Sequence, residues 1–286
     1  MTTIIKIGGA AIEDASILRK CAESVAQLAG GGHRIVIVHG GGKTLSCTLL
    51  QLGIKSQFVD GLRVTDAATR DVALMVLAGL VNKRLVAAML QAGVSVLGLC
   101  GGDGTMFRAR KKKVEGRDLG FVGEIANVDV RWLEAIWQQG GVPVLASVAL
   151  GEDGEYYNVN ADEMASACAA ACGAEMLAFL TDVEGVRDAS GSLIASLSEN
   201  DIPGLVANGT ISGGMLPKLQ ACTSALRQGV GRVRILAASR ADCLPRLHLN
   251  KDLIGTEVTR GDFGPAKIEP QDAVKEGVEI EYSVAK

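Results

Sequence analysis

Residues 34–42 read RIVIVHGGG, a run of isoleucine and valine that ends in a histidine and three glycines. An apolar run without polar alternation predicts a strand buried on both faces, as in a parallel sheet. A similar strand is expected at residues 2–7, ending in Gly8-Gly9. An amphipathic helix capped by Asp14 and ending near Ala29 separates the two strands. This β-α-β order, with glycines at the carboxyl ends of strands, predicts a parallel sheet whose ligands bind at those ends.

A second informative stretch is YNVNADE at residues 157–163. It follows an apolar strand-like run at 142–148 and opens a run of small residues at 164–172 that predicts a buried helix. Two amides and a carboxylate therefore stand at a loop-to-helix junction, where the free helix N–H groups can face an anion. The alternative interpretation is a plain helix cap, in which Asn160 or Asp162 satisfies its own backbone.

Composition narrows the class of protein. The chain has 286 residues and a net charge of −3, which argues against nucleic acid as its main partner. Only 3% of the residues are aromatic while 36 are glycine, a balance typical of parallel α/β enzymes. The seven cysteines show no pairing pattern and indicate reduced thiols. We see neither a signal peptide nor an uninterrupted apolar run of about 18 residues, so a soluble, cytoplasmic protein is expected.

The remaining segments extend the sheet. Further strands are expected at 94–99, 175–180, 233–237 and 254–258, a loop or short hairpin at 58–65, and helices at 66–91, 132–139 and 218–228. Residues 105–128 predict a hairpin excursion; its basic cluster indicates a solvated face, with a role near substrate as the alternative. The predicted fold class is α/β, a three-layer α/β/α sandwich with a mainly parallel central sheet. We expect an N-terminal lobe at 1–173, a C-terminal lobe at 174–260, and a tail or edge addition at 261–286.

Glycines are expected at four strand ends, where backbone N–H groups can approach an anion closely. They are Gly8-Gly9, Gly40-Gly41-Gly42, Gly101-Gly102 and Gly213-Gly214. A single such end equally suits a tight turn, but several at one sheet edge favour an anion site. The glycines form neither a P-loop, because position 37 is Ile, nor a G-x-G-x-x-G fingerprint after a strand. A nicotinamide-dependent oxidoreductase is therefore disfavoured.

Two lysines stand where lysines are costly. Lys6 interrupts an apolar strand, and burying it requires an anionic partner. Lys218 falls in the first turn of a helix, where the helix dipole disfavours a cation unless an anion binds there. A phosphoryl group between them would explain both, with Asp162 orienting the two ammonium groups. The alternative for each lysine is an edge strand or a side chain that reaches solvent.

Seven stretches resemble the amino acid kinase family in order and spacing. They are IIKIGGA (4–10), IVIVHGGGK (35–43), DGLRVTD (60–66), MVLAGLVNK (75–83), NVNADE (158–163), LTDVEGV (180–186) and SGGMLPKL (212–219). The stretches themselves run from residue 4 to residue 219, and the resemblance extends to about residue 258, nearly the whole chain. The resemblance is greatest to the dimeric, arginine-insensitive members that phosphorylate N-acetyl-L-glutamate.

The resemblance implies roles for individual residues. Lys6 and Lys218 would stabilise the transferring phosphoryl group, and Asp162 would organise them. Four residues match positions that bind the acetylated amino acid, namely Gly41, Gly42, Arg63 and Asn158. The residues that match nucleotide-binding positions are Gly8, Gly9, Asp182, Val183, Glu184, Gly185, Val186, Arg187, Thr210, Ile211, Ser212, Gly213, Gly214 and Met215. ATP with Mg²⁺ would be the phosphoryl donor, although no carboxylate pair marks a metal site and the metal ligands stay unknown.

The implied activity is transfer of the γ-phosphoryl group of ATP to the side-chain carboxylate of N-acetyl-L-glutamate, in arginine biosynthesis, by a cytoplasmic homodimer. A carboxylate acceptor is ionised at neutral pH, which agrees with the lack of an evident general base. Two alternatives are a kinase for N-acetylaminoadipate or a related acidic amino acid, and a non-catalytic sensor on the same fold. One methylene is worth only about 1–3 kcal/mol in a pocket, so the sequence discriminates the longer acid poorly.

Overall fold

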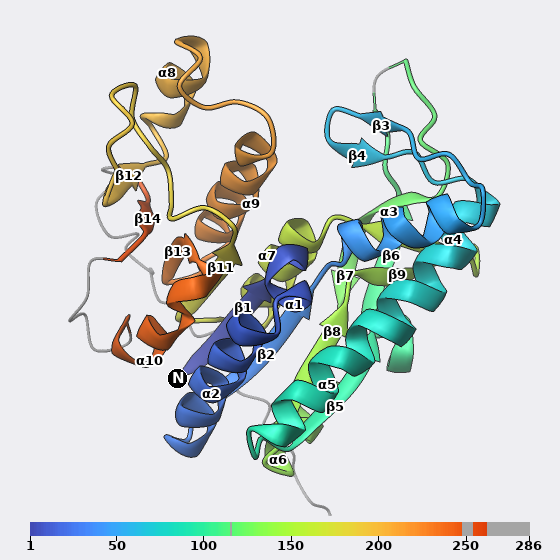
Figure 1. Cartoon of the computed structure of the whole chain (residues 1–286), viewed down its shortest axis with the longest axis horizontal. Helices are drawn as coiled ribbons and strands as arrows, with labels where there is room; N and C mark the ends of the chain where they lie inside the picture. Colours follow the sequence, from blue (N-terminus) through green and yellow to red (C-terminus); the bar gives the residue numbers. More distant parts are fainter. Residues whose placement is uncertain (115, 248–253, 262–286) are drawn as a thin grey trace, which may run out of the picture.

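A central eight-stranded sheet organises the molecule, and the computed structural model describes it for residues 1–114, 116–247 and 254–261 (Figure 1). In spatial order its strands are β12 (Ser196–Ser198), β14 (Thr256–Thr259), β13 (Arg232–Ala237), β11 (Met176–Thr181), β1 (Thr2–Ile7), β2 (Arg34–His39), β8 (Val142–Ala146) and β5 (Val96–Cys100). The six strands from β13 to β5 are mutually parallel; β14 pairs antiparallel with β13, and β12 pairs parallel with β14. The predicted α/β sandwich with a mainly parallel sheet is confirmed.

Helices cover both faces of this sheet. They are α1 (Gly9–Glu13), α2 (Ala15–Gly30), α3 (Gly42–Gln51), α4 (Ala67–Ala73), the π-helical η1 (Leu74–Val81), α5 (Asn82–Gln91), α6 (Arg131–Gln138), α7 (Ala161–Ala171), α8 (Ile202–Ala207), α9 (Met215–Arg227) and α10 (Leu244–Leu247). Two short 3₁₀ segments, η2 (Asp103–Thr105) and η3 (Ala238–Cys243), complete the set within the described ranges.

Successive residues along the central strands point alternately into two hydrophobic cores, one on each face of the sheet. Ile35 and Ile37 of β2 pack with α2, α3 and α5, whereas Val36 and Val38 pack with the core that contains α7 and α9. Because neighbouring strand residues point to opposite faces, both sides of the sheet must be apolar. The uninterrupted IVIV run therefore produces the three-layer arrangement.

A second, smaller sheet stands beyond the carboxyl ends of the central parallel strands (Figure 1). It is a closed barrel of β6 (Phe107–Lys111), β7 (Val122–Val128), β9 (Val148–Gly151) and β10 (Tyr156–Val159). The antiparallel pair β6–β7 confirms the predicted hairpin excursion. The predicted hairpin at 58–65 is β3 (Phe58–Val59) with β4 (Leu62–Arg63), which lies beyond this end of the sheet near α3 and α4 (Figure 1).

One continuous helical segment, Ala67–Gln91, is long and apolar enough by composition to cross a membrane. In this fold it is a core helix: η1 and α5 contact β5 and β8, and α5 also packs on α2. Its buried residues Val76, Leu77, Leu85 and Met89 belong to one of the two cores. One side of the segment is therefore packed inside the protein, while Met75, Leu80 and Leu90 are exposed.

Two local expectations need comment. Gly213-Gly214 was expected to end a strand, and this was wrong: the pair follows α8 and a loop, and it directly precedes α9. The tail expected from Gly261 lies outside the described residues, apart from Gly261 itself.

Candidate active site

Asp162 lies between two lysines. Its Oδ1 is 2.7 Å from Lys6 Nζ, and its Oδ2 is 2.8 Å from Lys218 Nζ. The three side chains come from β1, α7 and α9, and only 8% of Asp162 and 7% of Lys218 is exposed. One carboxylate therefore holds two ammonium groups, and the three side chains together carry a net charge of about +1 in a largely buried place.

Burial and charge act against each other on this cluster. Burial by itself would raise the pKa of Asp162, but the charges of Lys6 and Lys218 outweigh burial and lower that pKa to about 2. The pKa of Lys6 is lowered, mainly by burial and further by the charge of Lys218, while Asp162 opposes the shift. The carboxylate is consequently ionised at every pH at which the protein would work.

The helix cap resolves the two interpretations of residues 157–163. Asn160 is the N-cap of α7, and its Oδ1 accepts from the backbone N–H groups of Asp162 at 2.8 Å and Glu163 at 3.2 Å. Because Asn160 performs the capping, the carboxylate of Asp162 is free to turn toward the lysines. Capping and ion pairing are thus done by different residues of the same motif.

A cavity of about 240 Å³ adjoins this cluster. It brings together seven predicted residues, Lys6, Gly9, Gly41, Gly42, Arg63, Asn158 and Asp162. Its other lining residues are Gly40, Leu45, Phe58, Gly61, Leu62, Leu77, Val122, Ser147, Val159, Asn160 and Ala161. Among these others, the sequence assigned a ligand-binding or capping role only to Gly40 and Asn160, although Gly61, Leu62 and Leu77 belong to the family-like motifs.

Arg63 is held firmly at the cavity wall. Its Nη2 donates to Gly42 O at 3.1 Å and Ser46 Oγ at 2.6 Å, and its guanidinium lies 4.6 Å from the centre of the Phe58 ring. Burial lowers the pKa of Arg63, yet a guanidinium remains charged at neutral pH. A planar cation fixed in this way suits an anionic ligand such as a carboxylate.

The glycines at the ends of β1 and β2 approach each other. A Cβ on Gly9 would lie 3.7 Å from Gly41 Cα and Gly42 N, and one on Gly41 would meet Leu77 Cδ2 at 2.8 Å. Gly41 therefore has to be glycine because it rests directly on η1. Gly42 begins α3, whose first N–H groups have no acceptor within the helix.

Apart from Gly8 and Gly9 at the end of β1, the predicted nucleotide-binding residues fall in two segments, 182–187 and 210–215. Residues 182–187 follow β11, where Val186 N donates to Thr256 Oγ1 at 2.8 Å and Arg187 pairs with Glu184 at 2.7 Å. Residues 210–215 lead into α9, the helix that carries Lys218. Sequence reasoning did not single out a separate cavity of about 520 Å³ at α8 and β12. It is lined by Ile194, Ser196, Leu197, Asn200, Asp201, Gly204 and Leu205.

Comparison with known proteins supports one assignment of this arrangement. Residues 1–237 match the profile of the amino acid kinase family. The chain belongs to the amino acid kinase family.

Individual members of the family are similar over nearly the whole chain. The acetylglutamate kinase of Acidobacterium capsulatum is 58% identical over 258 residues, covering 90% of this chain and 99% of that protein. The acetylglutamate kinase of Koribacter versatilis is 54% identical over 258 residues, covering 90% of this chain and 98% of that protein. The crystal structure of smu.665 from Streptococcus mutans has a TM-score of 0.76 and 27% identity, covering 90% of this chain and 98% of that one. The family fold and the ordered motifs therefore agree.

Proposed function

We propose that this protein transfers the γ-phosphoryl group of ATP to the side-chain carboxylate of N-acetyl-L-glutamate, a step of arginine biosynthesis. The observation that carries the proposal is the buried Lys6–Asp162–Lys218 cluster beside a cavity that also contains Arg63 and Asn158. The choice of N-acetyl-L-glutamate as the substrate rests on the similarity to acetylglutamate kinases at 54–58% identity.

The cluster suits phosphoryl transfer because it presents two positive charges held at a fixed separation. Charge on the transferring group is spread over its oxygens, so positioned cations stabilise the transition state more than the ground state. Lys6 and Lys218 would contact these oxygens, and Asp162 would keep both ammonium groups oriented while making no bond to the substrate. Since Asp162 is ionised throughout, its orienting role does not depend on pH near neutrality.

The reaction needs no proton transfer. An ionised carboxylate oxygen of the acceptor forms a bond to the γ-phosphorus while the bond from that phosphorus to the β,γ-bridging oxygen breaks, giving an acyl phosphate and ADP. The acceptor would lie in the cavity of the N-terminal lobe, with its α-carboxylate facing Arg63 and its amide facing Asn158. Asn158 can both donate and accept, and its Nδ2 already lies 3.3 Å from Thr65 Oγ1.

ATP would bind in the C-terminal lobe along residues 182–187 and 210–215, with Gly8 and Gly9 near its terminal phosphates. In the described part of the chain, no three His, Cys, Asp or Glu side chains gather into a metal-binding cluster. Both Asp162 oxygens are occupied by lysines. Mg²⁺ would accordingly be held chiefly by the nucleotide phosphates, whose charge it neutralises.

The decisive experiment traps the acyl phosphate with hydroxylamine while ADP release is followed. We expect hydroxamate with N-acetylglutamate, and none with glutamate or aspartate. Equal use of N-acetylaminoadipate would leave the chemistry in place and reassign the substrate. Absence of hydroxamate with every acceptor, in folded protein that binds ATP, would replace this proposal with the sensor function.

Variants of the two lysines test the chemical roles. Lys6→Ala and Lys218→Ala each remove one positive charge from the transition state, and the rate is expected to fall by about two or more orders of magnitude. Lys43→Ala is a matched control, because Lys43 is exposed and forms a surface ion pair with Glu13 at 2.8 Å. A lysine variant with near-normal turnover would contradict the assigned role.

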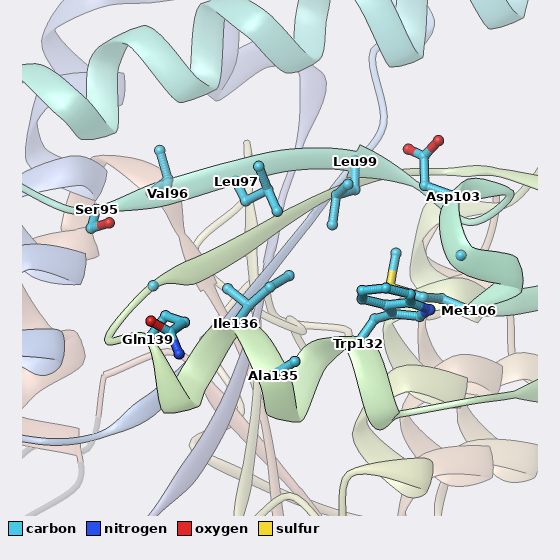
Figure 2. Close-up of a pocket in the computed structure, with 12 residues that line it drawn as sticks. Ser95, Val96, Leu97, Leu99, Asp103, Met106, Trp132, Ala135, Ile136 and Gln139 are labelled. Carbon is cyan, nitrogen blue, oxygen red and sulfur yellow. The ribbon is translucent and has the colours of Figure 1, made fainter.

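We also propose that the protein is a cytoplasmic homodimer formed through its N-terminal lobe. Strand β5 is an edge of the central sheet, and an apolar groove of about 560 Å³ lies between this strand and α6. Figure 2 shows the side chains that line it. Leu97, Leu99, Trp132 and Ile136 line the groove, and Leu97 and Trp132 are 49% and 54% exposed. An unpaired edge with exposed apolar side chains is a surface that a second copy can cover.

A further inference from the structure

His39 is a buried polar residue that the proposed chemistry leaves without a role. It is the last residue of β2, it has no exposed surface, and it immediately precedes the glycines of the acceptor cavity. Its Nδ1 lies 2.7 Å from Gly40 O, and its Nε2 lies 3.0 Å from Asn82 Nδ2. The imidazole therefore joins the glycine loop to the first residue of α5.

These contacts fix the state of the ring. Gly40 O can only accept, so Nδ1 must carry the proton and donate to it. The ring is neutral, because burial lowers the pKa of His39 to about 4, with a smaller effect from the charges of Lys6 and Lys83. Its Nε2 is then an acceptor for the amide of Asn82.

The orientation of Asn82 is equally constrained. Its Nδ2 also lies 2.9 Å from Val144 O and 3.3 Å from Leu99 O, two carbonyl oxygens that accept only. Its Oδ1 accepts from Lys83 Nζ at 3.2 Å. Exchanging the oxygen and nitrogen of the amide would point Oδ1 at two carbonyls, so only the observed orientation is satisfied.

Glycine at position 98 makes room for the contact between His39 and Asn82, and η1 supports the glycine loop on the other side. A Cβ on Gly98 would lie 2.2 Å from Asn82 Oδ1, so β5 admits the amide only because this position is glycine. On the other side, η1 supports Gly41 through Leu77 and Val81 and leads directly into Asn82. A π-helical segment of this kind is uncommon and is frequent at functional sites.

The consequence concerns the peptide between Gly40 and Gly41. In a planar trans peptide the carbonyl and the following N–H point in opposite directions. Holding Gly40 O toward the imidazole therefore turns Gly41 N–H away from it. Glycine residues have no side chain that could impose this orientation themselves.

We infer that His39 and Asn82 are positioning residues that fix the Gly40-Gly41-Gly42 loop in the form that binds the acceptor. This inference rests on the proposed function. The two residues affect the affinity for the acceptor, whereas ATP binding does not depend on them. They act through the loop and make no contact with substrate.

The test compares His39→Leu, Asn82→Leu and Gly98→Ala with wild-type protein in the hydroxamate assay. We expect the KM for N-acetylglutamate to rise about tenfold or more, since one orienting hydrogen bond is lost in each variant. The KM for ATP is expected to stay within about twofold of wild type, because the nucleotide segments lie on other elements. His39→Asn is the rescue variant: its Nδ2 can replace Nδ1 as donor to Gly40 O, and acceptor KM should recover most of the loss.

Hydrogen exchange of a peptide covering residues 38–45 gives a second readout that requires no turnover. The loop amides are expected to exchange faster in the three disruptive variants and near the wild-type rate in His39→Asn. Unchanged acceptor KM and unchanged exchange in folded Asn82→Leu and Gly98→Ala would overturn the inference. Equal increases in both KM values would also overturn it, because they indicate a general structural role. Wild-type protein without turnover would count against the proposed function, and the exchange pattern would still decide whether the two residues order the loop.

Discussion

At the scale of single residues, Asp162 determines most of the site's electrostatics. Two buried ammonium groups would repel each other strongly, and one carboxylate between them, 2.7 and 2.8 Å away, makes their burial tolerable. The cluster keeps a net positive charge, which a phosphate dianion can then neutralise. Charge that is only partly balanced in the free protein is thus consistent with a site that receives an anion.

Replacing Asp162 with asparagine removes the compensating charge with almost no change in shape. We expect the variant to lose about 3–5 kcal/mol of stability, because two buried cations are left without a counter-charge. Urea unfolding at neutral pH measures this difference, and activity is expected to fall below detection even where the variant is folded. An Asp162→Asn protein as stable as wild type would show that solvent reaches the lysines and that the cluster is not electrostatically coupled.

At the scale of secondary-structure elements, α7 is positioned by its cap. Asn160 caps α7 in the same way that Asp14 caps α2, where Asp14 Oδ1 accepts from Ser16 N at 2.9 Å and Ile17 N at 3.1 Å. These two caps are comparable because each accepts from two backbone N–H groups, and of this pair only the α7 cap adjoins the candidate site.

Asn160→Ala and Asp14→Ala form a matched pair. Each is expected to reduce stability by about 1 kcal/mol, the usual cost of losing an N-cap side chain. Only Asn160→Ala is expected to lower turnover, by about tenfold or more, since it loosens the helix end that carries Asp162. Thermal unfolding and the hydroxamate assay measure the two effects. Equal activity in both variants would contradict a link between the α7 cap and the site.

The stability of the protein is expected to depend on pH through His39, which lies where β2, β5, β8 and α5 meet. His39 has a folded-state pKa of about 4, below its ordinary value of 6.5, because burial disfavours the charged ring. Between these pH values the unfolded chain binds a proton that the native chain does not, so stability must fall as the pH is lowered from about 6.5 to 4. The shift corresponds to about 3 kcal/mol, fully lost once the pH reaches about 4.

Urea unfolding across pH 7 to 4 measures that loss, and His39→Asn provides the comparison. The free energy of unfolding of the wild type, relative to that of the variant, is expected to fall by about 3 kcal/mol over this range, because asparagine does not titrate. Parallel curves for the two proteins would show that His39 takes up a proton without unfolding.

At the scale of the whole molecule, the two edges of the central sheet differ in length. One edge is the short strand β12 and the other is β5, so the proposed dimer would use the longer free edge (Figure 1). The groove beside β5 is apolar along its length and polar at its ends, where Ser95, Asp103 and Gln139 lie (Figure 2).

Leu97→Glu places a charge in the middle of that edge and is expected to convert a dimer into monomers. A buried interface does not tolerate an unpaired carboxylate, whereas an exposed surface does. Leu50→Glu on α3 is the control, since Leu50 is 79% exposed and lies away from β5. Sedimentation equilibrium measures the mass of each variant. A Leu97→Glu protein with unchanged dimer mass would exclude this edge as the interface.

Much of the architecture was predictable because it depends on short-range patterns. The IVIV run of β2, the cap at Asp14 and the glycines after β1 and β2 follow from local periodicity and backbone preference. The closing of β6 and β7 into a barrel with β9 and β10 was not predicted, because strand pairing depends on contacts between distant segments. The π-helical stretch within the long helix 67–91 was also missed, since its residues, LMVLAGLV, are apolar almost throughout and show no pattern that separates a π-helix from an α-helix.

The sequence by itself determined where a charge is locally costly: one lysine stands in an apolar strand, and another stands in the first turn of a helix. What only the tertiary structure decided is how they meet. Asp162 and Lys218 are 56 residues apart, and His39 and Asn82 are 43 apart, yet each pair is in contact. Local patterns register the cost of placing a charge, whereas the partner that offsets it is chosen by the packing of whole elements across the sheet.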